Sequence, residues 1–227
     1  MSFDSRFPSP QHATPEGVIA VGGVLDVETL VDAYSHGIFP WPIEGVQQVV
    51  WFSPPRRGLL YVDEVHVSRS LRQIMRRENY RISMDTQFQA VLENCAQYHA
   101  QRNGGTWIRQ DLKDAFLKLH RAGFAHSLEV WDASGSLSGG LYGVSIGQMF
   151  AGESMFHRRP NYSKIALVEL ATFLRERHVK WFDVQVRNRF TTDMGARDVD
   201  RAHFLRMLHT AVSKEPSLFP AHHGKTS

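Results

Sequence analysis

Two carboxylates and one amide are the side chains of this sequence best placed to do chemistry. Glu153 ends a predicted strand, and Asp183 and Gln185 lie in a mostly apolar strand over residues 180–186. Because side chains alternate along a strand, Asp183 and Gln185 share one face. A buried acid is costly unless it is paired, so each acid could belong to a structural ion pair. Two acids beside a cleft instead favour proton transfer or cation binding.

Basic residues form the second candidate site. Of the 26 basic residues, 20 are Arg and 6 are Lys, and the net charge is +3. Guanidinium pairs with phosphate at two points, although a genome rich in G and C would give the same bias. A predicted helix opening at Ser68 carries Arg69, Arg72 and Arg76 on one face. A solvated helix face is the ordinary interpretation, but like charges at these spacings repel and cost stability, so a polyanion partner is an equal alternative.

Composition and motifs exclude several classes of protein. The 227 residues are 42% hydrophobic, which excludes a disordered chain, and no run approaches the ~20 apolar residues of a membrane helix. Residues 1–10 lack the apolar run of a signal peptide, so we expect a cytoplasmic protein. A single cysteine, Cys95, permits no internal disulfide. The histidines show no H-E-x-x-H spacing and no Gly-x-Ser-x-Gly elbow occurs, so we expect neither a metal nor a serine nucleophile.

Periodicity predicts an α+β fold. Residues 1–60 hold seven of the ten prolines and one short helix, opened by Asp26 and closed by Gly37. Later runs of period two predict antiparallel strands over 127–132, 137–145 and 148–153. A helix from Ser163 and the strand over 180–186 follow, an order typical of the acyltransferase fold of acetyl-CoA enzymes. The junction over 156–163 has no glycine, which weakens the expectation of a coenzyme A site.

Large apolar residues could line a pocket or fill the core. Trp41, Trp107, Phe116, Phe150 and Phe156 are the aromatic candidates, and most of them are expected to be core residues. Phe116 has the helical spacing of a core residue. Trp107 follows Gly104-Gly105-Thr106, so it is the better pocket candidate.

Short runs across the chain resemble the leucyl/phenylalanyl-tRNA–protein transferase family, in the family order over about residues 7–196. These runs include Phe7-Pro8-Ser9-Pro10, Gly37-Ile38-Phe39-Pro40-Trp41, Trp51-Phe52-Ser53-Pro54, His66-Val67-Ser68-Arg69-Ser70, Gly105-Thr106-Trp107-Ile108, Gly139-Gly140-Leu141-Tyr142-Gly143-Val144, Gly152-Glu153-Ser154-Met155-Phe156 and Asp183-Val184-Gln185.

The resemblance implies a two-domain enzyme. A small N-terminal domain (1–60) would pack on an acetyltransferase (GNAT)-like domain with a mixed β-sheet (61–227, loose after about 216). The enzyme would move Leu or Phe, with Met a further candidate, from aminoacyl-tRNA to the α-amino group of proteins that begin with Arg or Lys, and so mark them for degradation by the N-degron route. Because the ester is already activated, no cofactor or metal is expected.

The resemblance also assigns residues. Glu153, Asp183 and Gln185 fall on catalytic positions, and Trp41, Trp107, Leu141 and Phe150 match the side-chain pocket. We expect Phe116 and Leu170 to line the same pocket. From its charge, and not from the resemblance, the face of Arg69, Arg72 and Arg76 is expected to contact the tRNA acceptor stem. Phe190 and Asp193 depart from the family, in which His and Ser are usual at these positions.

The expected reaction is aminolysis of an ester by an amine whose pKa is about 7.7–8. Asp183, oriented with Gln185, would accept or relay the amine proton, and Glu153 would hold the cationic acceptor. Alternatively, both acids clamp cations and the ribose oxygen takes the proton. Two other functions stay open from the residues alone: an acetyl-CoA-dependent N-acetyltransferase and a non-catalytic tRNA-binding module.

Overall fold

The computed structural model describes residues 5–41, 43, 45–103 and 106–219. The predicted turn at Gly104-Gly105 and the tail beyond residue 219 lie outside the described residues. None of the helices in the described ranges combines the length and the apolar character that crossing a membrane requires.

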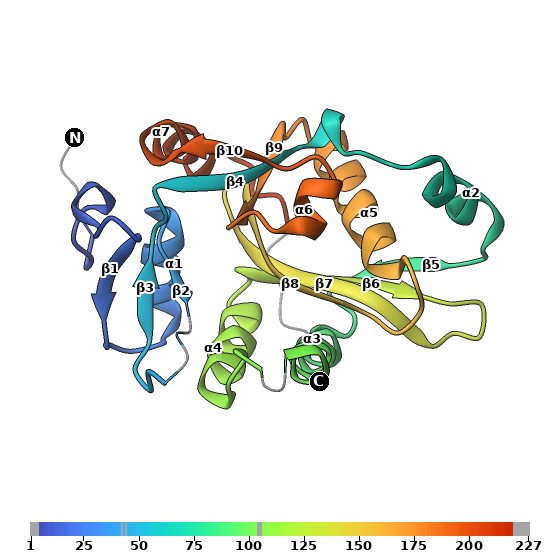
Figure 1. The fold of residues 1–227 in the computed structure, drawn as a ribbon, viewed down its shortest axis with the longest axis horizontal. Coiled ribbons are helices and arrows are strands. Elements are labelled where there is room, and N and C mark those ends of the chain that lie inside the picture. The colour runs from blue at the N-terminus through green and yellow to red at the C-terminus, as the bar shows by residue number, and fades with distance from the viewer. Residues whose placement is uncertain (1–4, 42, 44, 104–105, 220–227) are drawn as a thin grey trace.

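Two sheets with surrounding helices make up the described part of the chain (Figure 1). The strands are β1 (Val18–Val21), β2 (Phe39–Trp41), β3 (Val50–Phe52), β4 (Arg56–Tyr61), β5 (Arg81–Met84), β6 (Ala125–Trp131), β7 (Leu137–Ile146), β8 (Met149–His157), β9 (Trp181–Gln185) and β10 (Arg197–Asp200). The helices are α1 (Val27–Ser35), α2 (Arg69–Arg77), α3 (Phe88–Asn103), α4 (Gln110–Arg121), α5 (Tyr162–Glu176), α6 (Arg189–Asp193) and α7 (Arg201–Val212).

The small sheet, ordered β1-β3-β2, carries the predicted short helix as α1. The Asp26 carboxylate caps α1 by accepting the backbone N–H of Thr29 at 2.8 Å. Gly37 ends the helix with a φ of +74°, and a Cβ at this position would lie 2.8 Å from the side chain of Leu205 in α7. Both the left-handed backbone and the close helix therefore require glycine here.

The large sheet is mixed, in the order β10-β4-β9-β8-β7-β6-β5, and the expected α+β class is confirmed. Strands β6, β7 and β8 form an antiparallel meander, and β9 returns parallel to β8 after α5. Helix α5 packs on one face, whereas α3 and α4 pack on the other (Figure 1). The succession of β6, β7, β8, α5 and β9 is the one predicted from the change of period along the sequence, whereas the places of β10, β4 and β5 in the sheet were not predicted.

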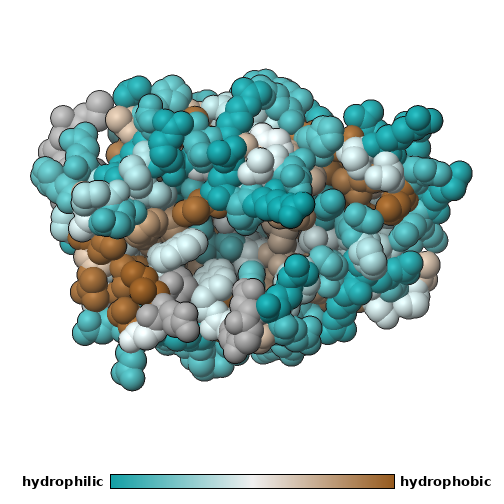
Figure 2. Space-filling view, in the orientation of Figure 1, coloured by the Kyte–Doolittle hydropathy of each residue, from teal (hydrophilic) through white to brown (hydrophobic). Residues whose placement is uncertain are grey.

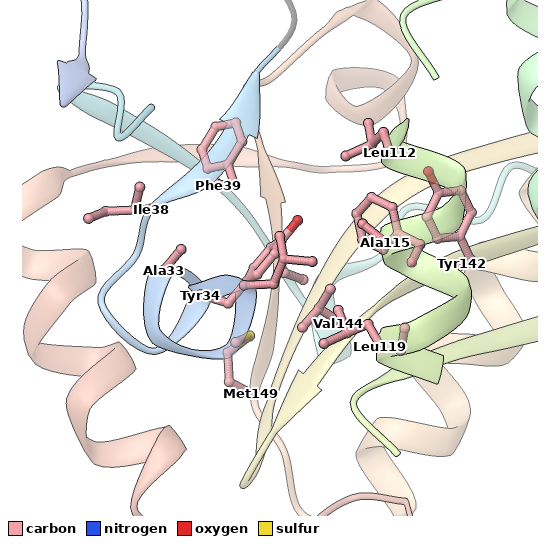
Figure 3. Packing of buried hydrophobic residues seen from close by; sticks show 14 of the residues in the cluster. Ala33, Tyr34, Ile38, Phe39, Leu112, Ala115, Leu119, Tyr142, Val144 and Met149 are labelled. Atoms are coloured by element: carbon pink, nitrogen blue, oxygen red, sulfur yellow. The ribbon is translucent and has the colours of Figure 1, made fainter. Parts of the chain in front are cut away.

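The hydrophobic core continues from the small sheet into the large one. Figure 3 shows Tyr34 of α1 close to Ala115 of α4 and Val144 of β7, and these residues belong to one buried cluster. Strand β4 pairs with β9 and β10 of the large sheet although it begins at residue 56. The two sheets thus divide between β3 and β4, and the division into domains at residue 60 stays a prediction.

One strand differs from its predicted bounds in a way that affects the site. Glu153 does not end its strand, because β8 runs on to His157. Gly152 pairs with Gly143 and Ser154 pairs with Tyr142, so Glu153 is an extra residue in a β-bulge. The alternation of residues 148–153 does not reveal where such a bulge falls.

Candidate active site

Asp183 lies within β9 and is 1% exposed. Arg57 of β4 donates from Nε to Asp183 Oδ1 at 2.8 Å and from Nη2 to Oδ2 at 2.6 Å. The Arg57 guanidinium lies 4.5 Å from the ring centroids of both Phe39 and Phe204, and its Nη1 donates to the carbonyl of Gly37 at 3.0 Å. A buried two-point ion pair of this kind satisfies both charges and fixes the carboxylate.

Gln185 is the last residue of β9 and has a φ of +60°, a region that residues other than glycine rarely adopt. The backbone N–H of Gln185 donates to Asp183 Oδ1 at 2.7 Å, which stabilises this conformation. At the same residue the side-chain Nε2 donates to Glu153 Oε1. Strained backbone of this kind is common where a side chain is positioned for function.

The bulge and the divergence of two strands bring Glu153 to Gln185. Strands β8 and β9 pair only at Ala151 and Asp183, so they separate just beyond that point. Glu153 follows Ala151 by two residues, as Gln185 follows Asp183. The extra residue of a bulge re-aims a side chain, and here it presents Glu153 to the space between the two strand ends.

Glu153 has an unusual environment for a carboxyl group. The buried hydroxyl of Tyr34 in α1 donates to its Oε1 at 2.7 Å. Burial raises the pKa of Glu153 to about 7, and the charge of Asp183 acts in the same direction. The hydrogen bonds from Tyr34 and Gln185 and the charge of Arg57 lower this pKa but do not offset burial. An acid with a pKa near 7 can accept or release a proton at neutral pH.

A cavity of about 820 Å³ opens beside this network, and Glu153 and Gln185 both line it. Figure 2 shows this face of the molecule hollowed near its centre. One wall is apolar, formed by side chains of β7, β8, α5 and β9: Leu141, Met155, Leu167, Leu170, Phe182 and Val184. The cavity therefore joins an apolar slot to a partly buried acid, which suits a ligand with a small apolar side chain next to a basic group.

Four of the six predicted pocket residues line this cavity: Trp41, Trp107, Leu141 and Leu170. Phe116 and Phe150 do not. Phe116 is fully buried in α4, with its ring centroid 5.3 Å from that of Tyr142. Phe150 is 1% exposed in β8 and lies beside Phe219, with ring centroids 6.1 Å apart. Both rings fill the core, as the helical spacing of Phe116 suggested.

The predicted catalytic residues come together, but they are not equivalent. Glu153 and Gln185 face the cavity, whereas Asp183 does not line it and its oxygens are taken by Arg57 and by Gln185 N–H. Asp183 therefore cannot meet a ligand directly. Its geometry fits a positioning role that acts through Gln185.

Sequence reasoning missed two residues of this network, Tyr34 and Arg57. Tyr34 has the spacing of an ordinary core residue on the apolar face of α1. Arg57 lies in a run that reads as exposed, although it is 1% exposed in the structure. A buried Asp in a strand needs a basic partner, and this requirement was the one indication in the sequence that an Arg or Lys lies beside Asp183. Because the chain has 20 Arg, the sequence does not identify the one that pairs with Asp183.

The basic helix forms a separate surface. Arg69, Arg72 and Arg76 are exposed on α2 and line a groove of about 780 Å³. Ser68 caps the helix by accepting the N–H of Leu71 at 3.2 Å, as the sequence predicted. The groove shares no lining residue with the cavity. Across residues 5–219 as described, no group of three or more His, Cys, Asp or Glu side chains could hold a metal ion.

Comparisons with known proteins match almost the whole chain to one family. The model of the leucyl/phenylalanyl-tRNA protein transferase matches residues 59–209, and that of its N-terminal domain matches residues 23–55. The chain is 45% identical over 215 residues to the leucyl/phenylalanyl-tRNA–protein transferase of Anaeromyxobacter dehalogenans (strain 2CP-C), covering 95% of this chain and 91% of that one. It is 41% identical to the protein of that name from Maridesulfovibrio salexigens, covering 95% and 89%.

A third relative of the same name, from Pseudomonas fluorescens (strain Pf0-1), is 46% identical over 190 residues, covering 84% of this chain and 83% of its own. Among solved structures, L-PGS from Bacillus licheniformis aligns with a TM-score of 0.43 and 11% identity, covering 72% of this chain and 52% of that one. That structural likeness is too low to support a conclusion.

Proposed function

The chain belongs to the leucyl/phenylalanyl-tRNA–protein transferase family, and from that premise we propose that it transfers Leu or Phe to proteins beginning with Arg or Lys. Its class is an aminoacyltransferase that uses aminoacyl-tRNA and acts on protein N-termini. The donor side chain, the acceptor residue and the roles of the site residues are the proposal. The observation that carries it is the partly buried acid Glu153 at the end of an apolar slot.

The apolar wall of the cavity accounts for the choice of donor. Leu141 and Leu170 face a slot without charged groups of its own, and Trp41 and Trp107 line the same cavity. Leu, Phe and Met can each bury their side chains there. Because apolar pockets discriminate only about 10–200-fold per methylene, we expect transfer of related side chains at lower rates.

Glu153 is proposed to meet the α-amino group of the acceptor. The amine nitrogen attacks the ester carbonyl carbon, an amide bond forms, and the bond from that carbon to the ribose oxygen breaks. The nitrogen loses a proton to Glu153, which passes it to the ribose oxygen. The pKa of Glu153 near 7 and the amine pKa of about 7.7–8 are close, so this transfer is nearly balanced.

Gln185 and Asp183 are proposed to position the reactants. The Gln185 amide holds Glu153, and Asp183 holds the backbone of Gln185. Well-oriented reactants can gain up to about 7–11 kcal/mol of the barrier, so such positioning has room to matter. The alternative in which the ribose oxygen takes the amine proton itself uses the same positioning and leaves Glu153 as a cation clamp.

The cationic side chain of the acceptor needs a second acid. Asp193, at the end of α6, is the other carboxylate that lines the cavity, and it is exposed. It forms no ion pair within the residues that the structure describes. We propose that Asp193 binds the Arg or Lys side chain, a role the usual family Ser could not fill by charge.

The basic face of α2 is proposed to bind tRNA. Phosphate contacts from Arg69, Arg72 and Arg76 would position the acceptor stem without reading its sequence. Addition of Leu or Phe would give the acceptor protein a new apolar N-terminus, and we propose that this marks it for degradation by the N-degron route.

The direct test is incubation of the protein with Leu-tRNA and a peptide that begins with Arg. Mass spectrometry should find one leucyl residue added at the peptide N-terminus. The same peptide with an acetylated α-amino group and a peptide beginning with Glu are the matched controls, and neither should react. Acetylation of the Arg peptide from acetyl-CoA, with no transfer from Leu-tRNA, would contradict the proposal.

A further inference from the structure

The cavity has a second polar end, far from the acid network along β8. It is lined by side chains from three elements: Arg102 in the last turn of α3, His157 at the end of β8, and Lys164 in the first turn of α5. His157 lies four residues beyond Glu153, about 13 Å along the strand. There is thus room for a ligand of nucleotide size between the two ends.

This end is positively charged, and its charges are not neutralised by the protein. Neither Arg102 nor Lys164 forms an ion pair within residues 5–41, 43, 45–103 and 106–219. Burial lowers the pKa of His157, and the positive charges of Arg102 and Lys164 lower it further, with no carboxylate acting against them. A bound anion would relieve this repulsion.

The cluster is also held in place. The Arg102 guanidinium lies 5.2 Å from the ring centroid of Tyr98, and its Nη1 donates to the Tyr98 hydroxyl at 3.0 Å. The Tyr98 and His157 rings lie 5.0 Å apart, and His157 Nδ1 is 3.1 Å from Ser163 Oγ. Ser163 and Lys164 sit in the first turn of the 15-residue helix α5, whose positive dipole end adds to the charge.

The end of α2 that follows its basic face abuts this part of α5. Glu78, directly after α2, accepts the hydroxyl hydrogen of Tyr162 at 2.9 Å, and Arg159 lies 3.7 Å from the same carboxylate. Tyr80 contacts Glu169 of α5 at 2.9 Å. The end of α2 and the cationic end of the cavity therefore both lie beside the first turn of α5.

We propose that Arg102, His157 and Lys164 bind the phosphate on the 5′ side of the nucleotide that carries the aminoacyl ester. This inference rests on the proposed function. It assigns the two ends of the cavity to the two substrates: the acidic end to the acceptor amine and the cationic end to the RNA backbone. Such contacts fix the position of the ester relative to the acceptor amine and do not depend on which base the nucleotide carries.

Two small donors that differ only in the 5′-phosphate measure its contribution to the reaction. They are the 3′-leucyl ester of adenosine and the 3′-leucyl ester of adenosine 5′-phosphate. For the unaltered protein we expect kcat/KM with an Arg peptide to favour the phosphorylated ester by on the order of tenfold, mainly through KM. Arg102→Gln and Lys164→Gln should each bring that ratio toward one. Arg175→Gln, in the last turn of the same helix and outside the cavity, should keep the ratio.

A ratio near one in the unaltered protein would overturn the proposal, as would equal losses on both esters in the Arg102 and Lys164 variants. A coenzyme A site would replace this assignment under three combined results. Coenzyme A would bind the unaltered protein in calorimetry, Arg102→Gln would weaken that binding, and the two esters would react with equal kcat/KM. If neither ester reacts although intact Leu-tRNA does, the site requires more of the tRNA and the assignment fails. If Leu-tRNA is inert as well, it is the proposed function that fails.

Discussion

Tyr34 and Glu153 lie 119 residues apart in the sequence, yet the Tyr34 hydroxyl donates a 2.7 Å hydrogen bond to the Glu153 carboxylate. Tyr34 belongs to α1 and Glu153 to β8, so the helix beside the small sheet contributes directly to the acid network of the large sheet. Tyr34 belongs to the buried cluster that continues between the two sheets (Figure 3), whereas Glu153 lines the cavity. The small sheet therefore has a role in the site, because the helix packed beside it affects the ionisation of the proposed catalytic acid.

Replacing Tyr34 by Phe should shift the pH dependence of transfer. The Tyr34 hydrogen bond lowers the pKa of Glu153, so its loss should raise this pKa above about 7. The rise of kcat/KM with pH should move to higher pH, with little change at the alkaline plateau. Tyr80→Phe is the matched control, because its hydroxyl bonds Glu169 outside the cavity. An unchanged profile in Tyr34→Phe would remove this contact from the mechanism.

Breaking the Arg57–Asp183 ion pair should destabilise the fold. Arg57→Met leaves a buried carboxylate without its partner, which costs about 3–5 kcal/mol. Urea unfolding measures this loss. The double variant Arg57→Met with Asp183→Leu removes both charges and should regain much of the stability, while transfer stays impaired because Gln185 is no longer held. Recovery of full activity in the double variant would show that the positioning role of Asp183 is incorrect.

Pocket variants should separate specificity from stability. Leu170→Ala enlarges the slot and should shift the Phe-to-Leu ratio of kcat/KM toward Phe by on the order of tenfold. Phe116→Leu lies in the core outside the cavity and should leave that ratio unchanged, while it lowers the free energy of unfolding by about 1–3 kcal/mol. Competition between Phe-tRNA and Leu-tRNA measures the ratio. A change of the Phe-to-Leu ratio in Phe116→Leu would show that Phe116 does contact the donor side chain.

Charge reversal on α2 should weaken tRNA binding. Arg72→Glu with Arg76→Glu should lower affinity for uncharged tRNA and reduce the slope of log affinity against log salt by about 2, because each lost phosphate contact contributes about one. Filter binding at several salt concentrations measures both. Turnover of the leucyl ester of adenosine, which carries no phosphate, serves as the control and should persist. Unchanged binding would exclude α2 from the tRNA surface.

Local pattern was enough to predict much of the fold. The period-two runs over residues 127–153 became β6, β7 and β8, and the apolar face after Ser163 became α5. The edge strands β5 and β10 were not predicted, because their sequences are mixed and charged and their pairing partners are distant in the chain. An edge strand is set by its neighbour more than by its own residues.

The site was predicted in part. The acids of β8 and β9 stand out because charged groups are rare in apolar strands. Their separate roles could not be predicted, because these depend on Arg57, which approaches from β4, and on a bulge at Glu153 that one strand alone does not encode. Phe150 was expected in the pocket from the resemblance, but its ring is buried beside Phe219 and does not line the cavity.

The central claim is that Glu153, at the end of the apolar slot, takes the proton of the attacking amine. Single-turnover transfer from Leu-tRNA to an Arg peptide, followed against pH in the unaltered protein and in Glu153→Gln, tests it most directly. The ionised carboxylate is the base, so the rate of the unaltered protein should rise as pH passes about 7. Glu153→Gln should be slower by on the order of 10²–10⁴-fold and should keep only the rise that deprotonation of the attacking amine gives near its own pKa of about 7.7–8, with binding of the Arg peptide largely retained. A variant that keeps the fast rate, or that fails only through loss of peptide binding, would contradict the claim.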